Sequence, residues 1–597
     1  MNVPMKLLRE LFRPRAVRLP PLVWLMVIAL VAFLVMQRTP GGTTPDTRVI
    51  VLTPTPMAGA APTPTPVGSG GTLAFTMRHN GNSDIYLLSQ GDGQLLRLTY
   101  DPADDRDPAW SPDGRWLAFA SHRAGNWDLY VMDMEAGTLL RLTRDPAFQA
   151  GPSWSPDGKW LAYESYADGN LEIHILSVEG EQDYRLTYDP APDFSPAWSP
   201  DGRHIAFTSL RDGNKEIYLV SLDGGDLVNL TRTPEQDEDH AAWSPDGAYL
   251  AYQSGVPAEQ TLRILPFDRE ASTSGQLRPI FFGIGGDPAW SPDGKALAFI
   301  VRQGPTLSTN HLIAASTKGW AMAQEGFNST DWLEDPSWTA ATLPPALTAQ
   351  LQAKMAQTED PLYTELDLGP DEEGHVRLVG LPGVNGGENR EQLSDRVNDS
   401  FNALRRRVEE ETGWDYLGTL GDSWRSMDHT PRPGQGRISW HVCGRAIDVD
   451  QSFLRKGLIE LVREDVGGVT YWRVFIKAKR QDGSMGEPLR DLPWDLEARK
   501  EGGMAAAYGG KPKEEVPPGY YVDFTQLAAD YGWERRNALP NWRTSWFDIE
   551  WWHFQKTEGM SWYDCMLEMY DSQVISDSYG TLPWWTQRPE WEAEQLP

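Results

Sequence analysis

Short runs that alternate between apolar and polar residues recur along the first half of the chain. Runs of the type Leu-Ala-Phe or Leu-Ala-Tyr begin at Leu73, Leu117, Leu161, Ile205, Leu250 and Leu297. Polar turn residues follow, and then a second apolar run such as DIYLL or EIYLV. Alternation of this kind is typical of half-buried strands. The pattern therefore predicts a series of short strands over residues 72–340.

The same region contains a sequence repeat. The pentapeptide WSPDG begins at Trp110, Trp154, Trp198, Trp243 and Trp290, and a degenerate DPSW ends at Trp338. Ser-Pro-Asp-Gly favours a tight turn, because proline presets φ and glycine closes the turn. A four-stranded repeat of about 40–45 residues is typical of a propeller blade. Six strands of the Leu-Ala-Phe type predict six blades, and the spare segment at Trp338 is expected to complete the first blade.

These repeats resemble the TolB-like and WD40-like β-propellers over roughly residues 72–340. The resemblance predicts the fold but no activity, because one fold carries many functions. A ligand site at WSPDG is the alternative to a turn with a packing tryptophan, and turn chemistry alone explains the motif. The central channel or one face of the propeller could bind a protein or cell-wall partner, which the sequence does not identify.

The N-terminus contains an uncharged apolar run from Leu19 to Met36. About 18 apolar residues suffice to cross a bilayer core. Arginine and lysine dominate residues 1–18, so the positive-inside rule keeps this segment cytoplasmic. We therefore expect residues 19–37 to be a transmembrane signal-anchor of a single-pass protein of the cell membrane. The rest of the chain, after this anchor, is expected to lie outside the cytoplasm. A cleaved signal peptide is the alternative, but QRTPGG after the run lacks the small-residue cleavage site.

Composition divides the remainder of the chain. Residues 38–71 are rich in Pro, Thr, Gly and Ala, which predicts an extended stalk. Residues 341–385 contain Pro and Gly pairs typical of a linker, and helical spacing of apolar residues predicts a helix over 391–410. A tryptophan-rich domain is expected at 386–575, followed by a tail at 576–597.

Charge and cysteine content exclude several classes of function. The net charge of −30 disfavours nucleic-acid binding, because phosphates need a basic surface. The two cysteines, Cys443 and Cys565, exclude a disulfide framework or a cysteine-based metal cluster. They could pair with each other if the chain is exported. Cys443 could also bind a metal, or pack as a small apolar side chain.

Two stretches of the last domain combine metal-binding residue types. In SWHVCGRAIDVD, a strand after the glycine turns Asp448 toward His441 and directs the intervening apolar residues to the core. In FDIEWWHFQ, His553 supplies a third ligand type and Glu550 a carboxylate. Two imidazoles and a carboxylate suit a catalytic zinc that keeps a position for water. Positions three apart point to opposite faces of a strand, so we expect a local distortion between Glu550 and His553.

These residues resemble the VanY-type D-alanyl-D-alanine carboxypeptidases and related zinc peptidases of the bacterial cell wall. The matching patterns are Ser-x-His-x-x-Gly-x-Ala-x-Asp and Glu-x-Trp-His, with looser likeness in GDSWRSMD and FTQLAADYGWERR, over roughly residues 390–565. The resemblance implies that Zn²⁺ is held by His441, Asp448 and His553. It also implies Glu550 as general base, Arg425 as the cation that stabilises the oxyanion, and Ser439 as a substrate-positioning residue.

The sequence thus predicts a multidomain protein with an N-terminal transmembrane helix, a six-bladed all-β propeller and a C-terminal α+β zinc peptidase domain. The expected reaction is hydrolysis of peptidoglycan stem peptides, as a D-alanyl-D-alanine carboxypeptidase. The alternatives are an L,D- or D,D-endopeptidase, or a non-catalytic wall-binding or sensory module with a structural zinc. The presence of Glu550 argues against the non-catalytic module, because a structural zinc site needs no general base. Residues 465–519 exceed the family's length and could form a lid, a specificity loop or a docking surface for the propeller.

Overall fold

A computed structural model describes residues 70–587, except 181, 223–226, 256–259, 269–277, 304–308, 318–322, 358–359, 386–390, 429–437 and 583. Among the described residues, 70–366 and 370–587 belong to one compact unit. The expected anchor at 19–37 and nearly all of the expected stalk lie outside the described residues. Within the described part, the helices are too short or too polar to cross a membrane.

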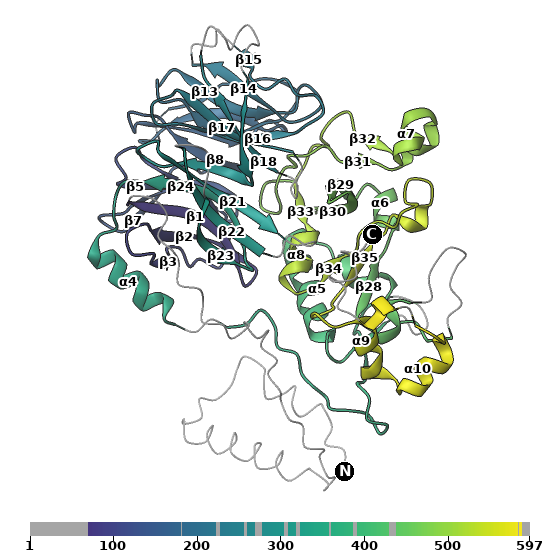
Figure 1. Cartoon of the computed structure of the whole chain (residues 1–597). Coiled ribbons are helices and arrows are strands. Elements are labelled where there is room, and N and C mark those ends of the chain that lie inside the picture. Colours follow the sequence, from purple (N-terminus) through teal and green to yellow (C-terminus); the bar gives the residue numbers. More distant parts are fainter. Residues whose placement is uncertain are drawn as a thin grey trace, which may run out of the picture. The chain divides into compact units, whose positions relative to one another are not determined.

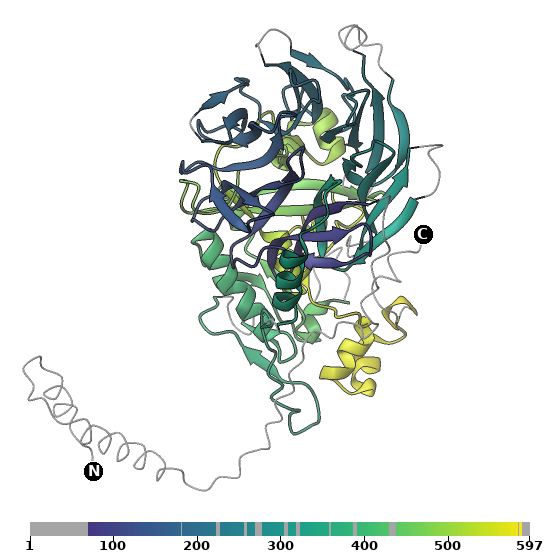
Figure 2. The same ribbon diagram turned by 90° about the vertical axis from the view of Figure 1, so that its left-hand side faces the viewer.

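Six four-stranded antiparallel sheets succeed one another along residues 72–339 and form the blades of a propeller (Figures 1 and 2). The first blade contains β1 (Thr72–His79), β2 (Asn82–Ser89), β3 (Leu95–Arg97) and, at its other edge, β24 (Trp332–Thr339). The second and third blades are β4 (Asp105–Trp110), β5 (Trp116–Ser121), β6 (Asp128–Asp133) and β7 (Thr138–Arg141), then β8 (Gln149–Trp154), β9 (Trp160–Ser165), β10 (Glu172–Ser177) and β11 (Asp183–Arg185). The fourth and fifth are β12 (Asp193–Trp198), β13 (His204–Ser209), β14 (Glu216–Ser221) and β15 (Leu227–Asn229), then β16 (Glu238–Trp243), β17 (Tyr249–Ser254), β18 (Thr261–Pro266) and β19 (Ile280–Ile284). The sixth is β20 (Gly286–Trp290), β21 (Ala296–Gln303), β22 (Thr309–Ser316) and β23 (Ala323–Ser329).

The ring closes as the repeat predicts. Strand β24 pairs with β1, with Leu73 opposite Trp338, so the last segment of the propeller completes the first blade. One strand of each blade also contacts its counterparts in the two neighbouring blades, and these six strands therefore lie at the centre of the ring: β4, β8, β12, β16, β20 and β24.

Each of these six central strands contains a residue with positive φ three positions before its tryptophan: Asp107, Gly151, Ser195, His240, Asp287 and Asp335. The pairing register shifts there in every blade, so the repeat encodes a β-bulge.

The WSPDG segments act as turns with packing tryptophans. The amide of Gly114 donates to the carbonyl of Ser111 at 2.8 Å, which closes the tight turn. The tryptophans are buried, and the indole of Trp154 donates to the carbonyl of Ala109 in the preceding blade at 2.9 Å. The motif therefore joins neighbouring blades, which agrees with the structural interpretation of the repeat.

The segment after the propeller contains more regular structure than its composition indicates. Helix α4 (Pro345–Met355) lies within the expected linker, and Leu351 packs into the core between the first two blades. Strands β25 (Leu378–Gly380) and β26 (Gln392–Ser394) pair, and helix α5 (Asn398–Thr412) follows. The predicted helix over 391–410 therefore begins too early, because Leu393 pairs with Val379 in a sheet and supplies core packing there.

The C-terminal part packs helices and short strands around a core that is rich in tryptophan. Its central sheet has the order β27 (Leu420–Asp422), β28 (Ala446–Val449), β35 (His553–Gln555) and β34 (Glu534–Arg535). A second sheet contains β29 (Ile459–Val466), β30 (Val469–Lys477) and β33 (Tyr521–Asp523), and a small one pairs β31 (Trp494–Asp495) with β32 (Lys511–Pro512). The helices are α6 (Ser452–Arg455), α7 (Gly503–Tyr508), α8 (Phe524–Asp530), α9 (Trp562–Met569) and α10 (Ser572–Tyr579), with 3-10 turns η1 (Tyr416–Gly418), η2 (Trp440–Cys443), η3 (Glu497–Glu501), η4 (Trp546–Asp548) and η5 (Trp584–Gln587).

The long segment 465–519 forms ion pairs with the propeller. Lys215 pairs with Asp491 at 2.7 Å, and Arg106 pairs with Glu487 at 2.7 Å. Arg490 also bonds to a carboxylate of the third blade. Part of this segment therefore serves as a docking surface, one of the three roles that the sequence left open.

Candidate metal centre

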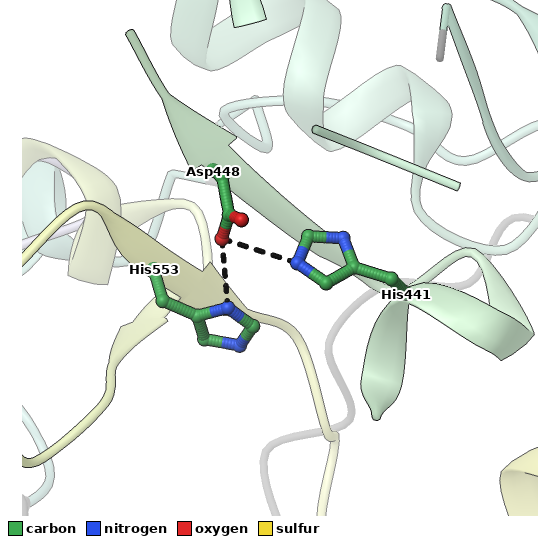
Figure 3. A group of neighbouring side chains, drawn as sticks. All are labelled: His441, Asp448 and His553. Atoms are coloured by element: carbon green, nitrogen blue, oxygen red, sulfur yellow. Dashed lines mark hydrogen bonds and ion pairs between the residues drawn. The ribbon is translucent and has the colours of Figure 1, made fainter. Parts of the chain in front are cut away.

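Three buried side chains meet on the central sheet of the C-terminal part (Figure 3). His441 Nε2 lies 3.1 Å from Asp448 Oδ1, and His553 Nδ1 lies 2.9 Å from the same oxygen. One ligand-type atom from each residue lies within 4.8 Å of the others, and among the described residues this is the group of three that could hold a metal ion. The structure thus brings together the two sequence motifs, which are about a hundred residues apart.

Local structure accounts for this convergence. Strands β28 and β35 are paired with Asp448 directly opposite His553, so both side chains point to one face of the sheet. His441 lies on η2, and Gly444, with a φ of 67°, follows its last residue as the C-cap. A Cβ at Gly444 would approach the backbone nitrogen of Ser394 to 2.7 Å, so the motif requires glycine there. The turn at Gly444 returns the chain so that His441 faces Asp448.

The chain is distorted between Glu550 and His553, as strand geometry requires. Glu550 has a φ of 60°, in the left-handed region that few residues other than glycine adopt. The amide of His553 donates to the carbonyl of Glu550 at 3.1 Å, which closes a turn through the two intervening tryptophans. This turn brings a strand residue and the carboxylate three positions before it to the same site. Non-glycine residues in this conformation occur at functional sites, and in this chain also at the bulges of the propeller.

Both imidazoles have a second partner that fixes their tautomer. His441 Nδ1 donates to the carbonyl of Ser423 at 2.9 Å, which leaves Nε2 without a proton in the neutral ring. His553 Nε2 lies 3.3 Å from Gln555 Oε1 and donates to it, which leaves Nδ1 without a proton in the neutral ring. Metal-binding histidines typically have such partners on the nitrogen that faces away from the ion. Neither Ser423 nor Gln555 was predicted from the sequence, although Gln555 follows His553 by two positions and so shares its strand face.

Electrostatics keep the central carboxylate ionised. Burial opposes ionisation of Asp448, but His441 and His553 outweigh it and hold the pKa of Asp448 well below its usual value. Burial works against protonation of His441, yet Asp448 outweighs it and raises the pKa of His441. An ionised carboxylate is ready to bind a cation, and an arriving metal would displace any proton on the imidazoles.

The donor set and its dimensions fit zinc. Zinc takes nitrogen and oxygen ligands at about 2.0–2.2 Å, which places neighbouring ligands of a tetrahedron roughly 3.3–3.5 Å apart. The two measured separations, 3.1 and 2.9 Å, need only a small expansion to reach these values. The rings of His441 and His553 are 5.0 Å apart and nearly perpendicular, so they approach one point from different directions. His441, Asp448 and His553 would therefore hold the ion.

Arg425 lies beside the metal-binding carboxylate. Its Nη2 is 3.4 Å from Asp448 Oδ2, the oxygen that does not face the imidazoles. Its Nε donates to Asp422, which lies opposite Asp448 on strand β27. Asp422 thus orients Arg425, a role that the sequence analysis did not assign. Ser439 instead lies at the start of η2, where its hydroxyl accepts from the amide of His441 at 3.3 Å. The role expected for Ser439 in substrate positioning stays a prediction.

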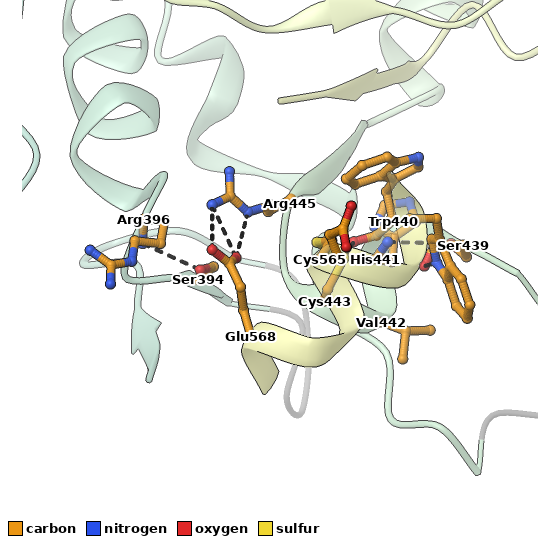
Figure 4. The surroundings of a disulfide bond; sticks show 12 residues. Ser394, Arg396, Ser439, Trp440, His441, Val442, Cys443, Arg445, Cys565 and Glu568 are labelled. Atoms are coloured by element: carbon orange, nitrogen blue, oxygen red, sulfur yellow. Dashed lines mark hydrogen bonds and ion pairs between the residues drawn. A yellow bond between two sulfur atoms is a disulfide. The ribbon is translucent and has the colours of Figure 1, made fainter. Parts of the chain in front are cut away.

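A disulfide joins the segment of His441 to helix α9 (Figure 4). Cys443 and Cys565 are bonded across a sequence separation of 122 residues. This pairing answers a question that the sequence left open, and Cys443 is therefore not a free thiol beside the metal site. Arg445 reinforces the same connection, because its buried guanidinium pairs with Glu568 of α9 at 3.1 Å.

Breaking the disulfide should destabilise the C-terminal part. The bond closes a long loop, and loss of a native disulfide of this kind typically costs about 2–5 kcal/mol. We expect the double variant Cys443→Ala/Cys565→Ala to show a lower melting temperature in calorimetry. Dithiothreitol should lower the melting temperature of the unsubstituted protein to a similar extent and leave the double variant unchanged. A reductant that shifts both proteins equally would contradict this role.

The pH dependence of activity should report Glu550. Burial raises the pKa of Glu550, and Asp448 adds to the rise, while His553 and Arg536 oppose it. A general base must be ionised, so kcat/KM should fall as the pH drops through this raised pKa. We expect the acid limb of the pH profile to lie above 4.5, the ordinary value for glutamate. A profile that stays flat down to that pH would contradict a raised pKa of Glu550 in the zinc-loaded protein.

The first half of the chain has recognisable relatives. The family model of the TolB beta propeller domain matches residues 46–149 and 143–342. The propeller is therefore TolB-like. No curated protein matches the chain. The TolB model ends at residue 342, so it does not extend to the metal centre.

Several solved structures also match part of the chain. TolB from Acinetobacter baumannii is 23% identical with a TM-score of 0.39, and the match covers 45% of this chain and 66% of that one. A putative TolB from Agrobacterium tumefaciens is 24% identical with a TM-score of 0.31, over 38% of this chain and 96% of that one. An oligogalacturonate lyase from Vibrio parahaemolyticus is 19% identical with a TM-score of 0.32, over 43% and 74%.

Proposed function

We propose that the chain is a zinc-dependent peptidase that hydrolyses peptidoglycan stem peptides, as a D-alanyl-D-alanine carboxypeptidase. The observation that carries the proposal is the convergence of His441, Asp448 and His553, each oriented for a metal ion, beside the strained residue Glu550. The likeness of both motifs to the VanY-type peptidases supports the choice of substrate. Zinc, when bound, would polarise the scissile carbonyl and lower the pKa of a water.

The protein's own residues divide the remaining work. Glu550 takes the proton of the attacking water and passes it to the leaving amine, and its raised pKa suits both steps. Arg425 supplies positive charge where the carbonyl oxygen becomes negative. To do so, the guanidinium of Arg425 must turn from Asp448 toward the substrate, while its Nε keeps the hydrogen bond to Asp422. Ser439 would contribute to substrate positioning at the start of η2.

We propose an extracytoplasmic location, with the N-terminal segment 19–37 as a membrane anchor. The disulfide between Cys443 and Cys565 supports this, because such bonds persist in oxidising compartments outside the cytoplasm. The propeller would hold the peptidase domain through the ion pairs of segment 465–519, and a further protein or wall partner could bind it. Nucleic acid is not an expected partner, because the net charge is −30.

A comparison of two substrates tests the reaction type. The purified extracytoplasmic portion should release D-alanine from a free stem pentapeptide, measured by liquid chromatography and mass spectrometry. A cross-linked muropeptide dimer without a free D-alanyl-D-alanine end should stay intact. Cleavage of the dimer inside its stem or crossbridge would favour the endopeptidase, and no cleavage of either would favour a wall-binding or sensory module.

A further inference from the structure

Arg536 belongs to the same face of the central sheet as the metal-binding residues. Its amide donates to the carbonyl of His553 at 3.2 Å, which continues the pairing of β34 with β35 by one residue. Residues directly opposite each other in an antiparallel pair project to the same face of the sheet. The next pairs across the sheet are His553 with Asp448 and Asp448 with Asp422. This row crosses all four strands, with the metal centre in its middle and Arg536 at its β34 end.

The charge of Arg536 reaches the metal centre. Neighbouring strands are about 4.8 Å apart, and an arginine carries its charge at the end of a long stem, so the guanidinium can extend into the space in front of His553. Burial raises the pKa of Glu550, and Arg536 opposes this rise more strongly than Asp448 adds to it. The positive charge of Arg536 therefore lies on the side of the metal centre where Glu550 is.

The guanidinium of Arg536 has unused donors. Its side chain is half-buried, and within the described part of the chain it forms neither an ion pair nor a side-chain hydrogen bond. The preceding residue differs, because Arg535 pairs with Glu464 and lies 5.2 Å from the centre of the Tyr471 ring, on the other face of the sheet. Arg536 is thus a cation on the metal face that is available to a ligand.

The proposed reaction brings a carboxylate to this side of the metal centre. Glu550 passes its proton to the leaving amine, so that amine must lie beside Glu550. In a carboxypeptidase the leaving residue is the last of the peptide, and its carboxylate is bonded to the same α-carbon as the amine. Arg425 lies at the other end of the row, beside Asp422. Arg536 is therefore the arginine on the side of the leaving group.

We propose that Arg536 binds the free C-terminal carboxylate of the peptide substrate through paired hydrogen bonds. This inference rests on the proposed function and deepens it, because it makes Arg536 the residue that selects the end of a peptide over a bond inside a chain. A chain that continues past the scissile bond presents an uncharged amide there and leaves the guanidinium without its partner. A carboxylate on a substrate side chain has the same chemistry, and the test distinguishes the two sources.

Binding to an inactive protein tests the assignment without turnover. The full-length, zinc-loaded Glu550→Gln protein should bind a stem pentapeptide about 10- to 100-fold more tightly than its C-terminal amide in calorimetric titration, as expected for a charge-assisted hydrogen bond. The amide keeps the glutamate carboxylate of the stem, so the comparison removes only the C-terminal charge. Adding Arg536→Gln should abolish the preference, and Arg536→Lys should restore part of it.

Arg543→Gln is the matched control and should keep the full preference. Arg543 is also half-buried and belongs to the same connection between β34 and β35. Its guanidinium lies 4.8 Å from the centre of the Trp542 ring, and that ring packs on Trp472 of strand β30 in the second sheet. The control thus removes an arginine of the same segment that is held against a different sheet.

The outcomes separate this inference from the proposed function. Equal binding of acid and amide, no binding of either, or a preference that survives Arg536→Gln would overturn the role of Arg536, even in a protein that hydrolyses stem peptides. A preference that depends on Arg536 in a protein that hydrolyses no peptide would keep the carboxylate site and overturn the peptidase. In the active protein, Arg536→Gln should raise KM by a similar factor, with little change in kcat, zinc content or melting temperature. A loss of zinc or a lower melting temperature in its place would show a structural role and overturn the assignment.

Discussion

Glu550→Ala should abolish peptide hydrolysis while zinc remains bound. The side chain is outside the trio of ligand-type atoms, so its removal leaves the metal-binding set intact. Loss of a general base typically lowers the rate by about 10²- to 10⁴-fold. Steady-state kinetics on a stem pentapeptide measures the rate, and elemental analysis of the dialysed protein measures bound zinc.

Glu550→Gln provides the second arm of this test. It preserves the size of the side chain at a residue with positive φ, so it separates loss of the base from loss of local structure. We expect the same fall in kcat as in Glu550→Ala, with an unchanged melting temperature. Full activity in either variant would contradict the assigned mechanism, and loss of zinc in both would show that Glu550 supports the metal site instead.

Removing any one of His441, Asp448 and His553 should eliminate both zinc and activity. Each alanine variant lacks one of the three proposed ligands. We expect its zinc affinity to fall by more than about 100-fold, because losing only the hydrogen-bond partner of a ligand typically lowers metal affinity by up to about 100-fold. Competition with a chromogenic chelator measures this affinity. Asp448→Ala should have the largest effect, since its Oδ1 contacts both imidazoles.

Two control variants provide reference values for the change in zinc affinity that loss of a ligand causes. Gln555→Ala removes only the partner of His553 Nε2, and its zinc affinity should fall by about 10- to 100-fold. His174→Ala removes a histidine of the third blade, where it pairs with Asp183, and should change neither zinc nor activity. Equal zinc affinity in the ligand variants and in His174→Ala would contradict the proposed metal centre.

The repeat made the propeller predictable from the sequence. The spacing of WSPDG and the extra segment at Trp338 define six blades and their closure, because a blade is a local unit whose strands follow one another. The bulge before each tryptophan was not predicted. Its first residue varies among Asp, Gly, Ser and His, and therefore shows no single sequence signal for positive φ.

The metal centre was predictable in its residues but not in its supports. Alternation within one strand indicates that Asp448 faces His441, yet only the pairing of β28 with β35 shows that it lies opposite His553. The tautomer of His441 depends on a backbone carbonyl at Ser423, which has no residue signature. The disulfide joins residues 122 positions apart, and its formation depends on tertiary packing of η2 against α9.

The segment 465–519 shows where sequence reasoning ends. Its length and its mixture of Lys, Glu, Gly and Pro indicated an addition to the domain without indicating its partners. The structure gives it ion pairs with the propeller at Glu487 and Asp491, and a contact with Trp546 at Arg499. Such long-range contacts depend on the fold of both parts, which local periodicity does not encode.

The most direct test of the account is mass spectrometry of muropeptides after incubation with the purified extracytoplasmic portion. The reactions would contain added zinc, a chelator, or the Glu550→Ala protein with zinc. We expect loss of one terminal alanine from pentapeptide stems in the reaction of the unsubstituted protein with zinc, and no product in the other two reactions. Unchanged muropeptides in all three reactions, from a protein that demonstrably holds zinc, would contradict the peptidase assignment.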